Sequence, residues 1–434
     1  MFAPDIVVDN NNMSCASKTL AFQSQVKSVN PHQKDRHPVA TSETARVINR
    51  RVLLNLIRKH QPVSRADLAR HSGLQRSTVS AITQDLIADS WVKEGEVHDL
   101  PRGRKPTVLH LNSARSGVFA INLRPYSINL ALVGLDGGVV IQETLPAPGS
   151  MPAFLEQVTR WIQRVASNHP AMLFEGIGVS LPGRIDLFSQ RFVFAPNLAW
   201  KHADLKQQLE AATGMNVHLE NEANACALSE LFYGGHKSRA GNLVALAVSE
   251  GIGVGMVLNG QLVRGPSGLA GEFGHVTLRE QGLPCACGNK GCWEMYASNT
   301  AALRYYYARK SSSHSKIRPG TSLPGPGEFE KLLHLAETGD PDATAALEEM
   351  SRQLGAGIAM LVTGLAPEVI VVVGEITRAW ERVEPLILNA IRERSFTHAQ
   401  ARLIARGPAH LPRLLGVSAL VMKERFDLPF AGFQ

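Results

Sequence analysis

Three cysteines and a histidine lie close together in the second half of the chain. The stretch "GEFGHVTLREQGLPCACGNKGCWE" contains His275, Cys285, Cys287 and Cys292. One imidazole and three thiolates are the soft ligand set that tetrahedral zinc prefers. Because four protein ligands leave no open coordination position, we predict a structural zinc ion rather than a catalytic one. The alternative is a set of reduced cysteines that binds no metal.

Two carboxylates flank this cysteine-rich loop. Glu272 precedes His275 by three residues, and Glu294 follows Cys292 by two. A metal that fixes the loop would hold both carboxylates toward the space that His275 faces. Carboxylate oxygens accept hydrogen bonds from hydroxyl groups, so we predict a polyhydroxyl ligand here. The alternative is that both are ordinary surface carboxylates.

A glycine-rich stretch, "SEGIGVG" from Ser249 to Gly255, follows an apolar run that predicts a strand. Glycines after a strand are typical of loops that hold phosphate with backbone N–H groups. Glu250 opposes this reading, because two like charges roughly 4 Å apart repel by about 4 kcal/mol at an effective dielectric constant near 20. No cation lies near Glu250 in the sequence. We therefore predict a pocket that has lost its phosphate site.

The N-terminal part of the chain has the pattern of a winged helix-turn-helix, which we place at residues 41–112. Helical spacing follows Ser42, and a second short helix is predicted between a capping-box pair, Ser64 and Asp67, and a terminating Gly73. A third helix is predicted in "LQRSTVSAITQDLIADS". The β-like runs "WVKEGEV" and "TVLHLN", joined by the basic "HDLPRGRKP", complete the wing.

Charge supports a nucleic-acid partner for this part. Residues 1–112 contain 16 basic against 10 acidic residues, a net charge of +6 out of +7 for the whole chain. Short polar side chains and an arginine begin the third helix, where recognition helices contact base edges. The predicted DNA contacts are Gln75, Arg76, Ser77, Thr78, Ser80 and Gln84 on that helix and Arg102, Arg104 and Lys105 in the wing. The alternative is a protein-docking module.

From residue 113 to the C-terminus, β-like and helical runs alternate, which predicts an α/β domain over residues 113–434. Residues 1–40 show no sustained period and predict a disordered leader, while Ser, Pro and Gly mark a mobile insertion at 309–329. The apolar runs are too short to span a membrane, and the polar N-terminus lacks a signal-peptide pattern. We expect a cytoplasmic protein.

The motifs "AGEFGH" and "CACGNKGCWE", with "VSLPGRID", "APNLAW" and "ENEANA" upstream, resemble the ROK family of repressors, open reading frames and sugar kinases. The likeness runs from about Gly117 to the C-terminus, and the fused winged helix with "GRKP" is similar to the repressor branch. The resemblance implies an actin-like, ribonuclease-H-like pair of α/β subdomains around a cleft, a structural zinc ion and a homodimer. It also implies sugar contacts from Asn221, Glu222, Glu272, His275 and Glu294, near Pro182 and Gly183.

Three departures separate the chain from the kinase members of that family. The Asp-Gly-Gly-Thr turn of the kinases is replaced by "INLRPYSI", the phosphate loop carries Glu250, and Glu222 stands at the catalytic aspartate. We therefore predict no enzymatic activity, and a DNA-binding regulator, a repressor of carbohydrate genes, whose operator binding responds to a sugar or sugar phosphate. The alternatives are an ATP-dependent sugar kinase, and a regulator switched by a partner protein. Activation instead of repression also stays open.

Overall fold

The computed structural model describes residues 42–97, 107–186, 191–194, 204–234, 241–265, 268–310, 325–395 and 401–426. The chain divides into a unit of residues 1–45 and a compact unit of residues 46–434. The predicted leader, 1–40, lies outside the described residues, as does 311–324 of the predicted insertion. Among the described helices, none is both long enough and apolar enough to cross a bilayer.

The N-terminal elements form a winged helix-turn-helix, as predicted. Helices α1 (Ser42–His60), α2 (Arg65–Ser72) and α3 (Arg76–Ala88) are followed by β2 (Val92–Val97) and β3 (Thr107–Leu111), and β3 also pairs with β1 (Val63–Ser64). Ser64 and Asp67 make the capping box that begins α2, and Gly73 ends it with a φ of 70°. The wing residues Arg102, Arg104 and Lys105 lie outside the described residues.

The first lobe is a five-stranded sheet in the order β10-β7-β4-β5-β6. Its strands are β4 (Ser116–Leu123), β5 (Ser127–Gly134), β6 (Val139–Pro146), β7 (Leu173–Leu181) and β10 (Val217–Asn221). Alternate side chains such as Phe119 and Ile121 pack against α4 (Met151–Asn168) and α5 (Leu205–Thr213) on the outer face. A two-stranded sheet of β8 (Arg184–Asp186) and β9 (Arg191–Phe194) extends from the end of β7.

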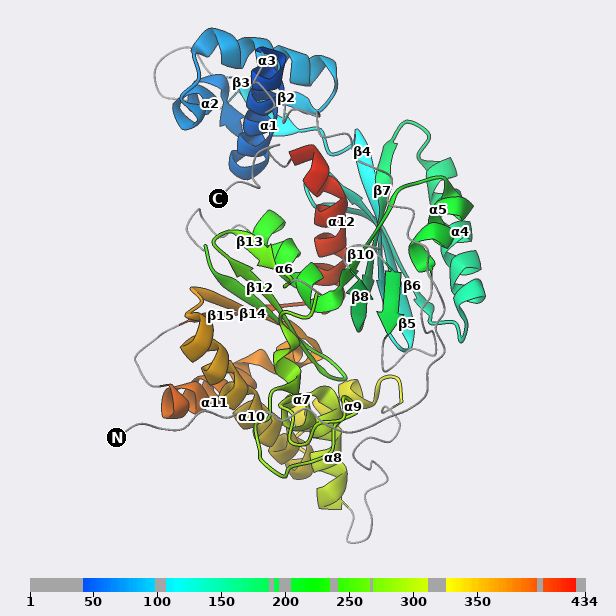
Figure 1. Cartoon of the computed structure of the whole chain (residues 1–434), viewed down its shortest axis with the longest axis vertical. Coiled ribbons are helices and arrows are strands. Elements are labelled where there is room, and N and C mark those ends of the chain that lie inside the picture. The colour runs from blue at the N-terminus through cyan, green and yellow to red at the C-terminus, as the bar shows by residue number, and fades with distance from the viewer. Residues whose placement is uncertain are drawn as a thin grey trace, which may run out of the picture. The chain divides into compact units, whose positions relative to one another are not determined.

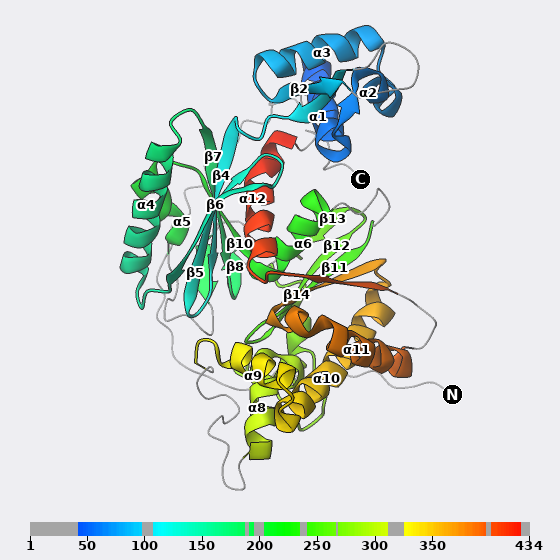
Figure 2. The ribbon, with the colours of Figure 1, turned by 180° about the vertical axis from the view of Figure 1, so that it is seen from behind.

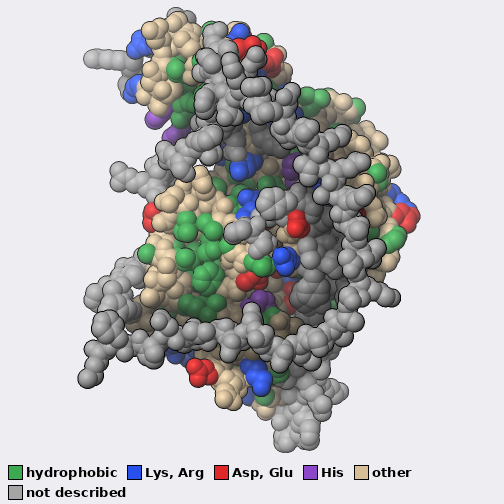
Figure 3. Space-filling view, in the orientation of Figure 1, with side chains coloured by type: hydrophobic (Ala, Val, Ile, Leu, Met, Phe, Trp, Pro, Cys, Tyr) green, Lys and Arg blue, Asp and Glu red, His purple; other side chains and the backbone are tan. Residues whose placement is uncertain are grey.

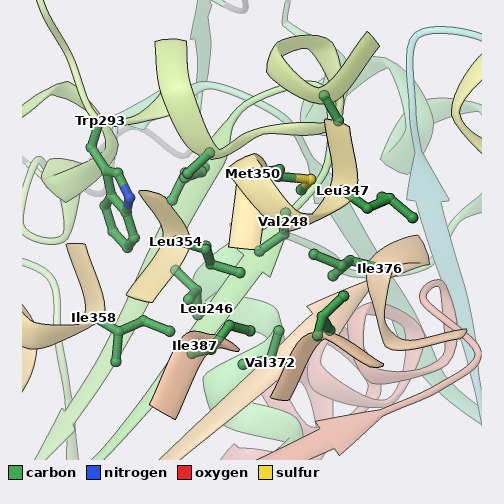
Figure 4. Close-up of a cluster of buried hydrophobic side chains, with 14 of the residues drawn as sticks. Leu246, Val248, Trp293, Leu347, Met350, Leu354, Ile358, Val372, Ile376 and Ile387 are labelled. Atoms are coloured by element: carbon green, nitrogen blue, oxygen red, sulfur yellow. The ribbon is translucent and has the colours of Figure 1, made fainter. Parts of the chain in front are cut away.

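The second lobe is a five-stranded sheet in the order β13-β12-β11-β14-β15. Its strands are β11 (Leu243–Val248), β12 (Ile252–Leu258), β13 (Gln261–Val263), β14 (Val369–Gly374) and β15 (Arg402–Arg406). The outer face is covered by α8 (Asn299–Lys310), α9 (Glu328–Glu337), α10 (Pro341–Leu365) and α11 (Trp380–Arg394). Figure 4 shows Leu246, Val248 and Val372 of the sheet against Leu354 and Ile387 of these helices.

Two helices, α6 (Glu222–Tyr233) and α12 (Leu411–Phe426), lie between the sheets in both Figure 1 and Figure 2. They pack closely against each other, with α12 on the inner face of the first sheet and α6 on that of the second. Side chains from both helices, such as Ala225, Leu414 and Val417, share one buried cluster with Ala120 and Ala131. This layering confirms the predicted α/β class with two subdomains.

Candidate functional site

The predicted metal ligands come together at one point of the second lobe. His275 ends the short helix η1 (Glu272–His275), and Cys292 lies just before α7 (Glu294–Ala297). One ligand atom from each of His275, Cys285, Cys287 and Cys292 lies within 4.8 Å of the others. The Sγ atoms of Cys287 and Cys292 are 3.6 Å apart, and the Cys285 Sγ is 3.6 Å from His275 Nδ1.

These separations fit a tetrahedral metal site. Ligands about 2.3 Å from a zinc ion lie about 3.8 Å from one another, and the donor set is the one zinc prefers. Burial, the largest effect, raises the pKa of the Cys292 thiol to about 11 in the metal-free protein. A divalent cation would reverse this, because coordination favours the thiolate. The cluster therefore fits zinc, with all four positions supplied by the protein.

The carboxylates predicted to meet a sugar lie beside this cluster. Glu294 Oε1 is 3.4 Å from His275 Nδ1, and Glu272 Oε2 is 3.8 Å from His275 Nε2. The Glu272 side chain is 50% exposed, whereas that of Glu294 is 19% exposed. Three of the five predicted sugar contacts, Glu272, His275 and Glu294, thus lie in one small region beside the cysteine cluster.

The other two predicted sugar contacts stand where β10 meets α6. The Asn221 side chain caps α6 by accepting a hydrogen bond from the Ala223 N–H, and it donates to the Gly183 carbonyl oxygen at 2.9 Å. Glu222 accepts a hydrogen bond from the Nε of Arg413, which is 0% exposed, at 2.9 Å. Arg413 lies near the start of α12, so this ion pair joins the two central helices.

The glycines of "SEGIGVG" serve packing as well as a turn. Gly253 and Gly255 lie within β12, where added Cβ atoms would come within 2.9 Å of the Ala223 Cβ and 2.2 Å of the Ala223 carbonyl oxygen. A Cβ at Gly251 would lie 2.7 Å from Glu294 Oε2. Because glycine has no Cβ atom at these three positions, β12 can pack against Ala223 at the start of α6, and the turn before β12 can lie next to Glu294.

The sequence offered no cation close to Glu250, but the fold supplies one. Arg124, in the turn between β4 and β5, donates from Nη2 to both carboxylate oxygens of Glu250 at 3.1 and 3.2 Å. Its Nη1 donates to Glu375, at the start of η2 (Glu375–Ala379). The charge of Glu250 is therefore paired in the fold, although no cation lies near it in the sequence. The 126 residues that separate Arg124 from Glu250 hid the pair from local sequence patterns.

Neighbouring charges favour the ionised forms of Arg124 and Glu375. Burial would lower the pKa of the Arg124 guanidinium, but Glu250 and Glu375 outweigh it and raise that pKa. Burial likewise opposes the charge of Glu375, yet Arg124 and Arg413 lower the pKa of the Glu375 carboxyl. Figure 3 shows Lys, Arg, Asp and Glu side chains gathered in the hollow between the two sheets. The cleft thus contains fixed charges of both signs.

The predicted recognition helix exposes the expected face. Val79, Ile82 and Leu86 are buried in the core of the winged helix. The predicted DNA contacts Gln75, Arg76, Ser77, Ser80 and Gln84 are exposed, and Thr78 is half-buried. Arg50 of α1 pairs with Asp89, which follows the C-terminal end of α3, at 2.7 Å.

The sequence model of the ROK family matches residues 118–424, and that of the IclR helix-turn-helix domain matches residues 51–95. The chain is 29% identical to the xylose repressor of Bacillus subtilis over 88% of this chain and 94% of the relative. A solved ROK family transcriptional regulator, a homologue of the E. coli MLC protein, aligns with a TM-score of 0.71 at 27% identity, over 88% of this chain and 98% of that one.

A ROK family glucokinase from Streptomyces griseus, solved with glucose and AMPPNP, aligns with a TM-score of 0.60 at 26% identity. This alignment covers 70% of the chain and 99% of the glucokinase. The kinase likeness therefore leaves out a substantial part of the chain, whereas the likeness to the regulator covers most of it. The chain belongs to the ROK family and carries a helix-turn-helix domain in front of the family's two-lobed domain.

Proposed function

We propose that the protein is a DNA-binding transcriptional regulator, acting as a repressor of carbohydrate genes, whose ROK domain binds a sugar or sugar phosphate that alters operator binding. The observation that carries the proposal is the exposed polar face of α3, which is combined in one chain with a ROK domain. A protein that only phosphorylates sugar has no use for such a face.

The N-terminal turn of α3 is the proposed reader of the major groove, which is wide enough to admit a helix. Arg76 can donate two hydrogen bonds to a guanine edge, and Gln75, Ser77 and Thr78 surround it. Ser80 and Gln84 continue this face of α3. The wing arginines and lysine, Arg102, Arg104 and Lys105, are proposed to enter the adjacent minor groove, where A·T-rich sequence concentrates negative potential.

The effector is proposed to bind between the two lobes. Glu272 and Glu294 would accept hydrogen bonds from sugar hydroxyls, and His275 would contribute the ring face or nitrogen not used by a metal. Glu222 would present a carboxylate that Arg413 holds in place. The Asn221 amide already links α6 to the Gly183 carbonyl, so its part would be to set the shape of the cleft wall.

We infer that this cleft carries out no phosphoryl transfer. A general base must be free to take the proton of the attacking hydroxyl, but Glu222 is held in an ion pair with the buried Arg413. The loop that would face a triphosphate presents the Glu250 carboxylate, and Arg124 is already bound to it. Both features oppose the alternative of an ATP-dependent sugar kinase.

A structural zinc ion is proposed at His275, Cys285, Cys287 and Cys292. Glu272 and Glu294 lie at either end of the segment that contains these ligands. Zinc bound there would order the segment and thereby place both carboxylates. The ion would contribute folding free energy rather than chemistry, because no coordination position remains for substrate.

Repression would require a homodimer and a route from the cleft to the winged helix. One winged helix contacts a short DNA segment, so useful specificity calls for two half-sites. The proposed route follows α6 and α12, which begin near the Glu222–Arg413 pair and end near the winged helix. The guanidinium of Arg58 in α1 lies 3.8 Å from the ring centroid of Phe232, near the end of α6, and 5.5 Å from that of Phe426, at the end of α12. A sugar releases DNA only if it binds the DNA-incompetent arrangement more tightly, typically by about 1–3 kcal/mol.

The test begins with thermal unfolding of the purified full-length protein against pentoses, hexoses, amino sugars and their phosphates. A ligand at 100 times its dissociation constant adds about 2.7 kcal/mol of stability. The stabilising sugar should then change retention of operator DNA on a gel at low salt. Sugar-dependent formation of ADP from Mg-ATP, with no duplex retained, would instead identify a kinase.

A further inference from the structure

We propose that Arg124, Glu250 and Glu375 form an ionic latch between the two lobes, which sets the opening of the cleft without any nucleotide. The latch joins the β4–β5 turn of the first lobe to the β11–β12 turn and the end of β14 in the second. Its effect on sugar binding rests on the proposed function, whereas its effect on the lobes does not.

Arg124 bonds to a different glutamate through each of its two terminal guanidinium nitrogens. Nη2 lies 3.1 and 3.2 Å from the two oxygens of Glu250, and Nη1 bonds to Glu375. The side chains of Arg124, Glu250 and Glu375 are 16%, 19% and 11% exposed. A planar guanidinium binds two carboxylates at defined positions, which a flexible ammonium does not. The latch therefore restrains the relative orientation of the two lobes as well as the distance between them.

Both glutamates are held by further bonds within the second lobe. Asn299 donates from Nδ2 to Glu375 Oε2 at 3.0 Å, and Thr300 donates from Oγ1 to the Glu250 carbonyl oxygen at 2.9 Å. The backbone N–H of Asn299 also donates to the Ser249 carbonyl oxygen at 2.8 Å. The acceptors are thus placed before Arg124 reaches them, which limits the entropy lost when the latch forms.

Open space on both sides shows that the contact is a bridge and not part of a packed core. A cavity of about 640 Å³ is lined by Arg124, Ser127, Gly374 and Glu375. A second cavity, of about 170 Å³, is lined by Arg124, Tyr126, Glu250 and Asn299. Arg124 and Glu375 thus line both cavities, and the ion pairs of Arg124 connect the two lobes beside them.

The latch also adjoins the proposed sugar contacts. Glu250 is followed by Gly251, and a Cβ atom added at Gly251 would lie only 2.7 Å from Glu294 Oε2. In a two-substrate cleft, a charged cosubstrate can bridge the lobes; here a side chain of the protein itself makes that bridge. A sugar then meets a cleft that is already close to its closed arrangement, and less binding energy is spent on closing it.

The test uses full-length protein with a dye pair at the exposed residues 173 and 331, one on each lobe, attached through non-canonical amino acids. The main variant combines Arg124→Gln, Glu250→Gln and Glu375→Gln, which removes every charge of the latch and leaves none unpaired. Arg160→Gln, in a surface pair of α4, is the matched control. Glu250→Gln alone serves as the milder variant if the triple variant fails to fold.

Energy transfer between the dyes, without ligand, should give a longer and broader inter-lobe distance in the triple variant than in the native and control proteins. The sugar found by thermal unfolding should bind the triple variant at least tenfold more weakly. An unchanged distance distribution in both the triple variant and Glu250→Gln would overturn the latch. Failure of every sugar to bind the native protein would overturn the proposed effector, while the distance measurement would still decide on the latch.

Discussion

At the scale of single residues, two arginines decide what the cleft can do. Arg124 pairs with Glu250 and Arg413 pairs with Glu222, the two carboxylates at which the sequence departs from the pattern of the sugar kinases. A carboxylate in a tight ion pair still accepts hydrogen bonds from a ligand, but it is a poor proton acceptor during catalysis. In this fold, Glu250 and Glu222 are therefore each held in an ion pair that connects elements distant in the sequence.

The pair of Glu222 and Arg413 gives a direct prediction for stability. Arg413→Gln should lower the free energy of unfolding by about 3 kcal/mol, the lower end for a broken buried pair, because it leaves the Glu222 carboxylate, which is 16% exposed, without its partner. Adding Glu222→Gln should restore most of the loss, since no charge is then left unpaired. Urea unfolding of the native protein, both single variants and the double variant measures the coupling. Strictly additive losses would show that the two residues act separately.

Glu272 tests the proposed effector site. Glu272→Gln should weaken binding of the stabilising sugar at least tenfold, because a hydrogen bond to a charged acceptor contributes about 1.5–3 kcal/mol. Thermal unfolding over a range of sugar concentrations measures the change. Glu280→Gln, an exposed carboxylate in the same segment, is the control and should bind normally. Normal sugar response in Glu272→Gln would move the effector elsewhere and favour regulation by a partner protein.

At the scale of elements, α3 gives a prediction that separates reading of bases from general attraction to DNA. Arg76→Ala should weaken operator binding by about 1–3 kcal/mol and relax the preference at one base pair, if Arg76 contacts a base edge. Gel retention with single-base operator variants measures both quantities. Arg160→Ala, in α4, is the control. A uniform loss on all sequences, with a reduced salt slope, would instead assign Arg76 to a phosphate.

The cysteine-rich segment gives a second prediction at this scale. The native protein should contain one zinc ion per chain by elemental analysis, and Cys292→Ser should lower both the zinc content and the melting temperature. Cys292 is 0% exposed and its Sγ lies 3.6 Å from that of Cys287, so the substitution removes a buried ligand of the proposed zinc ion. Cys15→Ser, in the leader, is the control. Full native stability in Cys292→Ser, or after exposure to a strong chelator, would exclude a structural role for zinc.

Local patterns predicted the elements well where one short segment contains the whole signal. The capping box of Ser64 and Asp67, the αL glycine at 73 and the apolar period of α3 all lie within a few residues of the structure they specify. The cysteine spacing likewise predicted the cluster of possible metal ligands, because Cys285, Cys287 and Cys292 are neighbours in the chain. The alternation of strands and helices predicted the α/β class for the same reason.

The charge balance of the cleft could not be predicted in this way. Arg124 reaches Glu250 and Glu375 across 126 and 251 residues, and Arg413 reaches Glu222 across 191. Such pairs depend on the order of strands in two sheets and on the packing of α6 against α12. The glycines of "SEGIGVG" were ambiguous for a different reason, since close packing against Ala223 and contact with phosphate demand the same absence of a side chain.

At the scale of the whole molecule, the ROK domain has two five-stranded sheets with a pair of helices between them, and three of its ion pairs lie where these layers meet. Glu220 pairs with Arg264, Glu230 with Arg406, and Glu222 with Arg413. Each pair joins α6 or the adjacent β10 to an element distant in sequence. Because partly buried pairs are screened little by salt, the layers should stay connected at physiological ionic strength.

Acid should therefore loosen the molecule in a defined pH range. Arg124 lowers the pKa of Glu375 below its usual value of 4.5, against the opposing effect of burial. A depressed pKa in the folded state stabilises the fold above the pKa of the unfolded chain, and this stability is lost as the pH falls through the folded value. Native protein and Glu375→Gln should thus differ in unfolding free energy by a constant amount between pH 6 and 8, and the difference should shrink only in acid, below about pH 4.5.

Urea unfolding of both proteins from pH 8 to pH 4 measures this difference. Glu381→Gln, which changes another carboxylate of the second lobe, is the control and should follow the native curve. A difference that changed between pH 6 and 7 would mean that a histidine controls the contact, because carboxylates with lowered pKa values stay ionised throughout that range. His410 lines the same cavity as Arg124 and Glu375, and burial, Arg413 and Arg124 lower its pKa. Constancy above pH 6 is therefore the result that follows from the charges around Arg124.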